Sequence, residues 1–105
     1  MTGSLRDSAS KDLWERIRRL EGRALPMMGT KIFAVTRVEP DKETAVTVVP
    51  STGIARTVLR REIEDAYRLG LRRDDIRPGK LQAQFPSMHN TSYVAGILRA
   101  ISESK

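Results

Sequence analysis

The side chains that most often perform catalysis or bind a metal are scarce in this sequence. His89 is the single histidine, and there is no cysteine. These two facts exclude a zinc site of cysteine and histidine, a thiolate nucleophile and the two-histidine HExxH motif. A serine nucleophile would need His89 as its base, and no G-x-S-x-G motif accompanies it. We therefore expect no catalytic residue, no metal and no cofactor.

Carboxylate pairs and glycine-rich loops give no stronger indication of an enzyme. Asp74 and Asp75 are adjacent, so they cannot face the same way on a regular element and fit charge balance for nearby arginines. Pro40 and Asp41 resemble the start of a metal-nuclease motif, but its acidic partner two positions before a lysine occurs only in residues 103–105. The glycines are scattered and form neither a dinucleotide-binding motif nor a P-loop. The sequence thus predicts no enzyme and no small-molecule substrate.

Basic residues, above all arginine, are the remaining feature with a functional meaning. Lysine and arginine together number 19 against 13 acidic residues, which gives a net charge of +6. Arginine supplies 14 of the 19 cations. Its guanidinium group binds phosphate through two parallel hydrogen bonds, so this bias favours a nucleic-acid partner. A genome whose codons favour arginine is the alternative explanation, and the sequence leaves both open.

The densest basic stretch covers residues 56–80, with eight cations and five acids. Two further residues, Asn90 and Thr91, open the last predicted helix, where free backbone N–H groups and side-chain donors suit an anion. Ordinary helix capping is the alternative role for this pair. We expect phosphate contacts from six of the cations: Arg60, Arg61, Arg72, Arg73, Arg77 and Lys80.

Two details of the predicted helix at residues 61–69 bear on this interpretation. Arg60 and Arg61 lie at its start, where positive charge opposes the helix dipole. An unfavourable placement favours a second use, such as phosphate contact. Further along, Glu64 and Arg68 have the spacing of an ion pair on one helix face.

The first part of the chain is predicted to be an arm followed by a helix. Residues 1–10 are small and polar and are expected to form a flexible N-terminal arm. Residues 11–105 then form a single small domain, as the chain length suggests. Leu13, Ile17 and Leu20 share one face of the first helix, which a glycine ends.

The middle of the chain predicts an antiparallel sheet. Residues 31–38, 44–49 and 54–59 are rich in β-branched side chains and are separated by short turns with proline, aspartate or glycine. Residues 24–28 are a candidate fourth strand. Short connections between consecutive strands predict an antiparallel meander.

The last third predicts three helices, over residues 61–69 and 78–85 and after a cap at residues 89–92. Gly96 lies inside the final helix, where glycine is unfavourable, and so predicts a close contact there. The final helix has a regular apolar face of Val94, Ile97, Leu98 and Ile101. We thus expect an α+β fold with an N-terminal helix, a three- or four-stranded antiparallel meander and three C-terminal helices.

Four short runs give the sequence a resemblance to a small, little-characterised bacterial α+β domain. Such domains occur alone or beside restriction-type nucleases and helicases, so the resemblance implies a role linked to DNA and no catalytic residue. The four runs are Leu13-Trp14-Glu15-Arg16-Ile17, Leu59-Arg60-Arg61, Asn90-Thr91-Ser92-Tyr93-Val94-Ala95 and Ile97-Leu98.

Together these features predict a non-enzymatic module that binds nucleic acid, with duplex DNA contacted through its phosphates. The alternative is a protein-interaction or homodimerisation module without a nucleic-acid ligand, in which an open strand edge of the meander pairs with a partner. No apolar run reaches the length of a membrane span, and no secretory signal opens the chain. We therefore expect a cytoplasmic protein that does not contact membranes.

Overall fold

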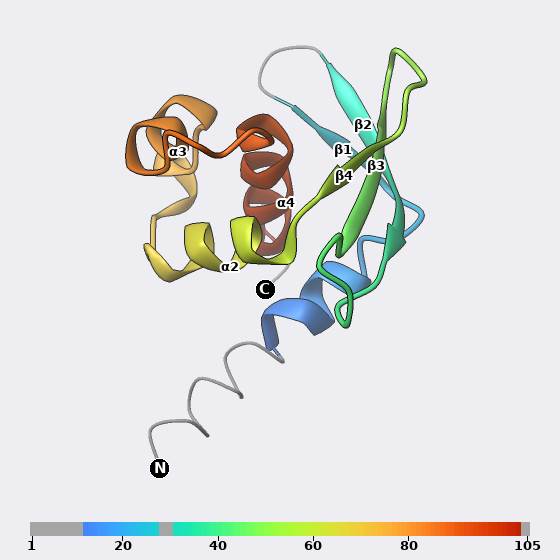
Figure 1. Cartoon of the computed structure of the whole chain (residues 1–105), viewed down its shortest axis with the longest axis horizontal. Coiled ribbons are helices and arrows are strands. Elements are labelled where there is room, and N and C mark those ends of the chain that lie inside the picture. The colour runs from blue at the N-terminus through green and yellow to red at the C-terminus, as the bar shows by residue number, and fades with distance from the viewer. Residues whose placement is uncertain (1–11, 28–30, 104–105) are drawn as a thin grey trace.

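The computed structural model describes residues 12–27 and 31–103. Within them an N-terminal helix over residues 12–18 precedes a four-stranded antiparallel sheet, and further helices follow (Figure 1). This order confirms the expected α+β fold. The predicted arm over residues 1–10 lies outside the described residues.

The sheet is an antiparallel meander in which spatial order follows chain order, β1-β2-β3-β4. Its strands are β1 (Ala24–Pro26), β2 (Ile32–Val38), β3 (Val46–Pro50) and β4 (Arg56–Val58). The candidate fourth strand at residues 24–28 is therefore present, as β1. β4 is shorter than the predicted span of 54–59, because only Arg56–Val58 pair with β3, opposite Val46–Val48. Ile54 in turn lies outside the strand and is 64% exposed.

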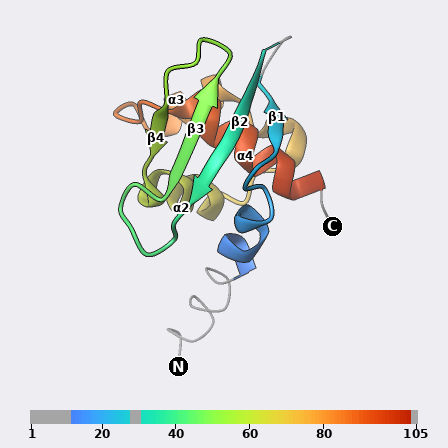
Figure 2. The ribbon, with the colours of Figure 1, turned by 90° about the vertical axis from the view of Figure 1, so that its right-hand side faces the viewer.

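One face of the sheet is buried and the other is open. Alternate residues of a strand point to the same side of a sheet. Every second side chain therefore points to the face that the rest of the protein covers, and these side chains are enclosed. A register shift between Val35 and Arg37 places Thr36 and Arg37 opposite Thr47, so both stay exposed. Figure 2 shows the helices behind the sheet and its other face uncovered by described residues. The enclosed side chains include Phe33, Val35, Val46, Val48 and Val58.

The C-terminal part covers the buried face of the sheet with helices. They are α2 (Arg60–Arg68), a short 3-10 turn η1 (Arg73–Asp75), α3 (Pro78–Gln84) and α4 (Thr91–Glu103). Helix α4 contacts β1, α2 and α3, so it is the centre of the core. Its predicted apolar face is confirmed, since Val94, Ile97, Leu98 and Ile101 are all buried.

Gly96 allows a close approach between α4 and the sheet. A β-carbon built on Gly96 would lie 2.7 Å from Cε1 of Phe33 and 3.3 Å from the carbonyl oxygen of Pro26. The Phe33 ring is also held edge-on against Tyr93, with ring centroids 5.3 Å apart. The close contact predicted from a glycine inside a helix is therefore present, and it explains why a larger side chain does not fit there.

This geometry predicts the effect of Gly96→Ala. Overpacking against Phe33 by the added methyl group costs about 1–3 kcal/mol, and most of this range exceeds the roughly 1 kcal/mol that alanine gains in a helix. We expect a lower midpoint of urea unfolding. Gly79→Ala in α3 is the matched control, because nothing lies within 4 Å of the β-carbon it would add. An equal rise in stability for both variants would show that the α4 contact is not tight.

Candidate nucleic-acid interface

The predicted phosphate-binding cations form two groups at opposite ends of α2. Arg60 and Arg61 begin this helix, whereas Arg72, Arg73, Arg77 and Lys80 follow its other end. A nine-residue helix is roughly 13 Å long at 1.5 Å per residue. The structure therefore separates the two groups, which sequence spacing alone had placed in one stretch.

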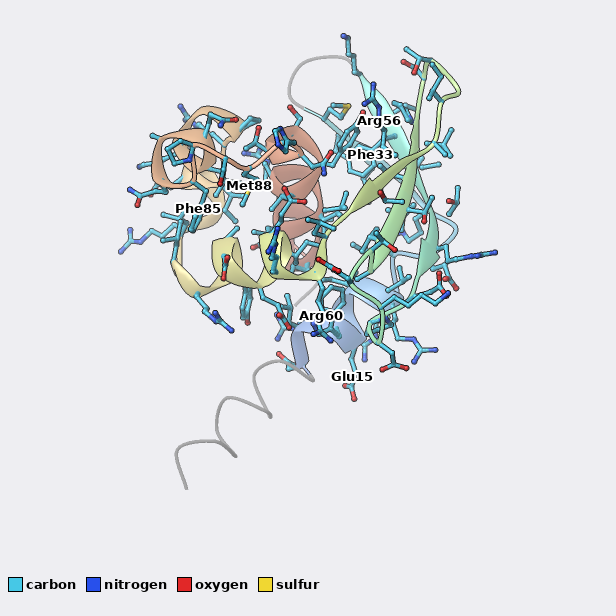
Figure 3. The ribbon with its side chains drawn as sticks, in the orientation of Figure 1. Glu15, Phe33, Arg56, Arg60, Phe85 and Met88 are labelled. Carbon is cyan, nitrogen blue, oxygen red and sulfur yellow. The ribbon has the colours of Figure 1, made fainter. Side chains whose placement is uncertain are left out.

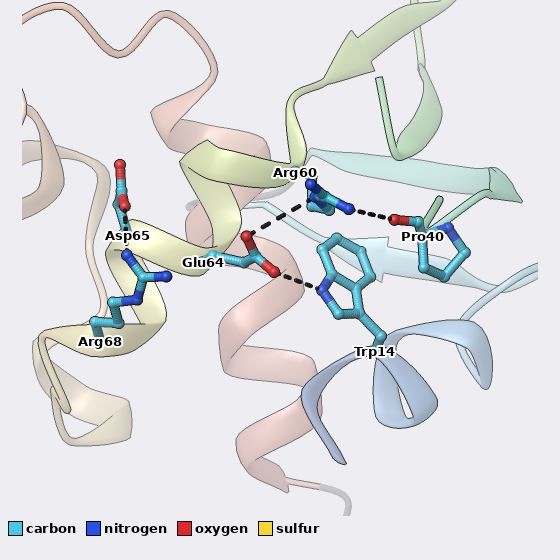
Figure 4. A network of polar contacts seen from close by, with 6 residues as sticks. All are labelled: Trp14, Pro40, Arg60, Glu64, Asp65 and Arg68. Atoms are coloured by element: carbon cyan, nitrogen blue, oxygen red, sulfur yellow. Dashed lines mark hydrogen bonds and ion pairs between the residues drawn. The ribbon is translucent and has the colours of Figure 1, made fainter. Parts of the chain in front are cut away.

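Arg60 belongs to a network of polar contacts that connects three parts of the fold (Figure 4). Its Nη1 donates to the carbonyl oxygen of Pro40 at 3.1 Å, and its Nε lies 3.9 Å from Oε1 of Glu64. The other carboxylate oxygen of Glu64 accepts a hydrogen bond from Nε1 of Trp14 at 3.0 Å. Arg60 and Glu64 thus connect α2 to the turn after β2 and to the N-terminal helix. This network accounts for an arginine at a helix start without any ligand.

The predicted ion pair between Glu64 and Arg68 is wrong. Arg68 instead pairs with Asp65, three residues earlier, at 3.3 Å between Nη1 and Oδ1. The reason is that the Glu64 carboxylate is directed toward Arg60, four residues earlier, and toward Trp14. The i, i+4 rule identifies a permitted pair, and tertiary contacts decide which pair forms.

In the second group most of the described cations already have a partner. Nζ of Lys80 lies 3.2 Å from Oδ1 of Asp75, and Nε of Arg77 donates to the carbonyl oxygen of Asp74 at 3.0 Å. The side chain of Arg73 lies outside what the structure describes. Arg72 is exposed, and its side chain makes no hydrogen bond or ion pair within residues 12–27 and 31–103. Arg72 is therefore available to an external anion.

Asn90 has neither of the two roles expected from the sequence. Its amide nitrogen donates to the carbonyl oxygen of Thr57 at 3.1 Å and to Oε1 of Glu62 at 3.2 Å. These bonds use both protons of the amide, so the side chain offers no donor to phosphate. Within the described residues no backbone N–H donates to its Oδ1, so it does not cap α4 either. Thr91, the other predicted donor, is the half-buried first residue of α4.

Glu62 is the buried charged residue to which Asn90 connects. Its side chain is only 8% exposed, and it also accepts the backbone N–H groups of Leu59 at 3.0 Å and His89 at 3.3 Å. One carboxylate therefore joins the end of β4, the start of α2 and the turn before α4. Removing Glu62 would take the acceptor from the N–H groups of Leu59 and His89 and from one N–H of the Asn90 amide, all of them partly buried.

Arg61 lies on a different side of α2 from Arg60, beside a groove of about 490 Å³. The groove separates α2 from the turn between α3 and α4, where Figure 3 labels Phe85 and Met88. Arg61 is exposed, and within the described residues its side chain has no hydrogen bond or ion pair. The groove is lined by Leu59, Arg61, Glu62, Asp65, Phe85, Ser87, Met88 and His89.

The structure also identifies basic residues that the sequence interpretation did not include. Arg18, Arg19 and Arg23 are exposed around the turn after the N-terminal helix, and none makes a side-chain bond in the described part of the chain. The same holds for Lys31 and Arg56. The sequence could have indicated the cluster of Arg18, Arg19 and Arg23, because it has three arginines within six residues beside a glycine.

Two absences apply to the described residues. Between residues 12 and 103, leaving out 28–30, no three histidine, cysteine or acidic side chains are grouped so that they could hold a metal ion. In the same ranges no helix is long and apolar enough to cross a membrane.

Comparison with known proteins gives no relative. No protein-family model, no curated protein and no solved structure matches this chain. The resemblance to a small bacterial domain therefore stays a prediction, and the site is argued from its own geometry.

The role of Glu62 can be measured directly. We expect Glu62→Ala to lower the free energy of unfolding by at least about 2 kcal/mol, because hydrogen bonds to a charged acceptor are lost and buried N–H groups are left unpaired. The matched control is Glu15→Ala, on an exposed helical position, for which we expect a change within about 0.5 kcal/mol. Urea unfolding followed by circular dichroism gives both values. Equal stability of the two variants would contradict the role assigned to Glu62.

Proposed function

We propose that this chain is a non-enzymatic module that binds nucleic acid through the phosphate backbone, with duplex DNA as the ligand. The observation that carries this proposal is a set of exposed arginines without a protein partner in the described ranges. A guanidinium group without a carboxylate keeps its forked donors free for a phosphate. These arginines are Arg18, Arg19, Arg23, Arg56, Arg61 and Arg72.

The acidic residues support the same proposal, because most of the described ones already have an ion pair or hydrogen bond within the protein. Glu39 pairs with Arg37 and Lys42, and Asp12 pairs with Arg16. Among the described residues, acidic side chains that are exposed and without a bond include Glu15, Asp41 and Glu43. None of the four strands contains an acidic residue. The excess positive charge is thus carried by arginines that face solvent.

Contact with the phosphates fits the described residues better than recognition of bases. Residues Val94 to Leu98 of α4 are buried, so this helix cannot enter a DNA groove. Trp14 and Phe33 are also buried, and no row of exposed aromatic side chains offers a stacking platform in residues 12–27 and 31–103. We therefore expect affinity that depends strongly on salt and weakly on DNA sequence.

The alternative of a homodimer that pairs strand edges has less support. Both edge strands, β1 and β4, are only three residues long. β1 ends at Pro26, which has no N–H to donate, and the carbonyl oxygen of Thr57 in β4 already accepts a bond from Asn90. Short edges with few free backbone groups are the usual protection against such pairing.

Binding to DNA is tested by fluorescence anisotropy with a mixed-sequence duplex of 20 base pairs at two salt concentrations. We expect micromolar affinity at low salt that falls steeply as salt rises, because binding to phosphates releases counterions. The double variant Arg61→Ala with Arg72→Ala should weaken binding and reduce the slope of log affinity against log salt by about one unit per lost contact.

The matched control removes the same charge from arginines that have an acidic partner. Arg16→Ala with Arg37→Ala lowers the net charge equally, but these side chains are paired with Asp12 and Glu39. It should therefore affect binding less than the test variant. If the folded protein did not bind the duplex even at low salt, the proposed function would be wrong.

A further inference from the structure

The groove beside Arg61 has the size of a small-ligand site. Its volume of about 490 Å³ lies within the usual range for such sites. Leu59, Phe85 and Met88 give it apolar walls, and the exposed Arg61 and His89 place nitrogen groups beside them. Glu62, Asp65 and Ser87 also line the groove, so it combines apolar surface with several polar and charged groups.

The walls of this groove are fixed by hydrogen bonds. Glu62 holds the backbone of Leu59 on one side and of His89 on the other. The turn between them is closed by a bond of 2.9 Å from the N–H of Met88 to the carbonyl oxygen of Phe85. A preformed groove loses little conformational entropy when a ligand binds, so modest contacts suffice for affinity.

The charged groups in the groove favour an anionic ligand. Glu62 is satisfied by its N–H donors, and Asp65 is paired with Arg68. Arg61 is the charged lining residue whose side chain has no partner among the described residues. The guanidinium group of Arg61 is therefore the lining group that is free to bind an anion.

We propose that this groove takes one unpaired nucleotide, with its base against Phe85 and Met88 and its phosphate on Arg61. This proposal rests on the proposed function and specifies which part of a nucleic acid the groove contacts. A base offers a flat apolar face to the half-buried Phe85 ring. The exposed hydroxyl of Ser87 adds a donor and an acceptor for the edge of the base. Since paired bases are stacked inside a duplex, the ligand is a nucleotide at an unpaired strand end.

The experiment compares a blunt duplex of 20 base pairs with the same duplex carrying three unpaired nucleotides at its 3′ or 5′ ends. We expect the intact chain to bind one of the two overhang duplexes at least about fivefold more tightly than the blunt one, as base stacking predicts. Phe85→Leu keeps an apolar side chain but removes the ring. It should abolish the preference for the overhang and leave affinity for the blunt duplex unchanged.

The matched control is Tyr67→Leu, which removes an exposed aromatic ring on α2 that does not line this groove. It should retain the overhang preference. Circular dichroism and urea unfolding establish that both variants are folded.

The outcomes separate the two proposals. Equal binding of blunt and overhang duplexes overturns the groove assignment and leaves the proposed function standing. No binding to any duplex overturns the proposed function. In that case calorimetry with adenosine monophosphate tests the groove assignment. If the nucleotide binds and Phe85→Leu abolishes the binding, the groove stands as a site for a free nucleotide. If the nucleotide does not bind, the groove assignment is overturned as well.

Discussion

The fold depends on one buried carboxylate. Glu62 accepts hydrogen bonds from the backbone of Leu59, the backbone of His89 and the side chain of Asn90. These donors come from segments that hydrophobic burial brings together but does not align. A single acceptor sets where β4 ends, where α2 begins and how the chain enters α4, since each N–H must find an oxygen when it leaves water. The groove beside Arg61 exists because this carboxylate holds its two walls at a fixed spacing.

The need to pair hydrogen-bonding groups within the protein also determines which charged side chains remain free to bind another molecule. Most of the described acidic side chains, such as Glu62 and Glu64, are bonded to other groups of the protein. Several exposed arginines have no such bond. Arg60 and Arg61 illustrate the difference. They are neighbours in sequence at the start of one helix, yet Arg60 binds the Pro40 carbonyl and Arg61 faces solvent. A count of basic residues cannot separate these two roles, because the separation is made by the direction of the side chain.

Local patterns predicted the elements of this fold well and the polar contacts poorly. The apolar spacing of Val94, Ile97 and Leu98 identified α4, and Gly96 correctly indicated a close approach. These signals are local, because helix periodicity and backbone sterics act within a few residues. The partners of Asn90 and Glu64 lie far away in sequence, and no local rule reports them. Whether the site residues bind DNA stays a prediction.

The hydrogen bond from Trp14 to Glu64 has a consequence for how this chain can be observed. The two residues are separated by 50 positions, and Trp14 is the single tryptophan of the sequence. During synthesis the N-terminal helix emerges well before its partner on α2, so this junction closes only after most of the sheet has been made. The tryptophan fluorescence of the protein therefore reports on the place where the first helix docks onto α2.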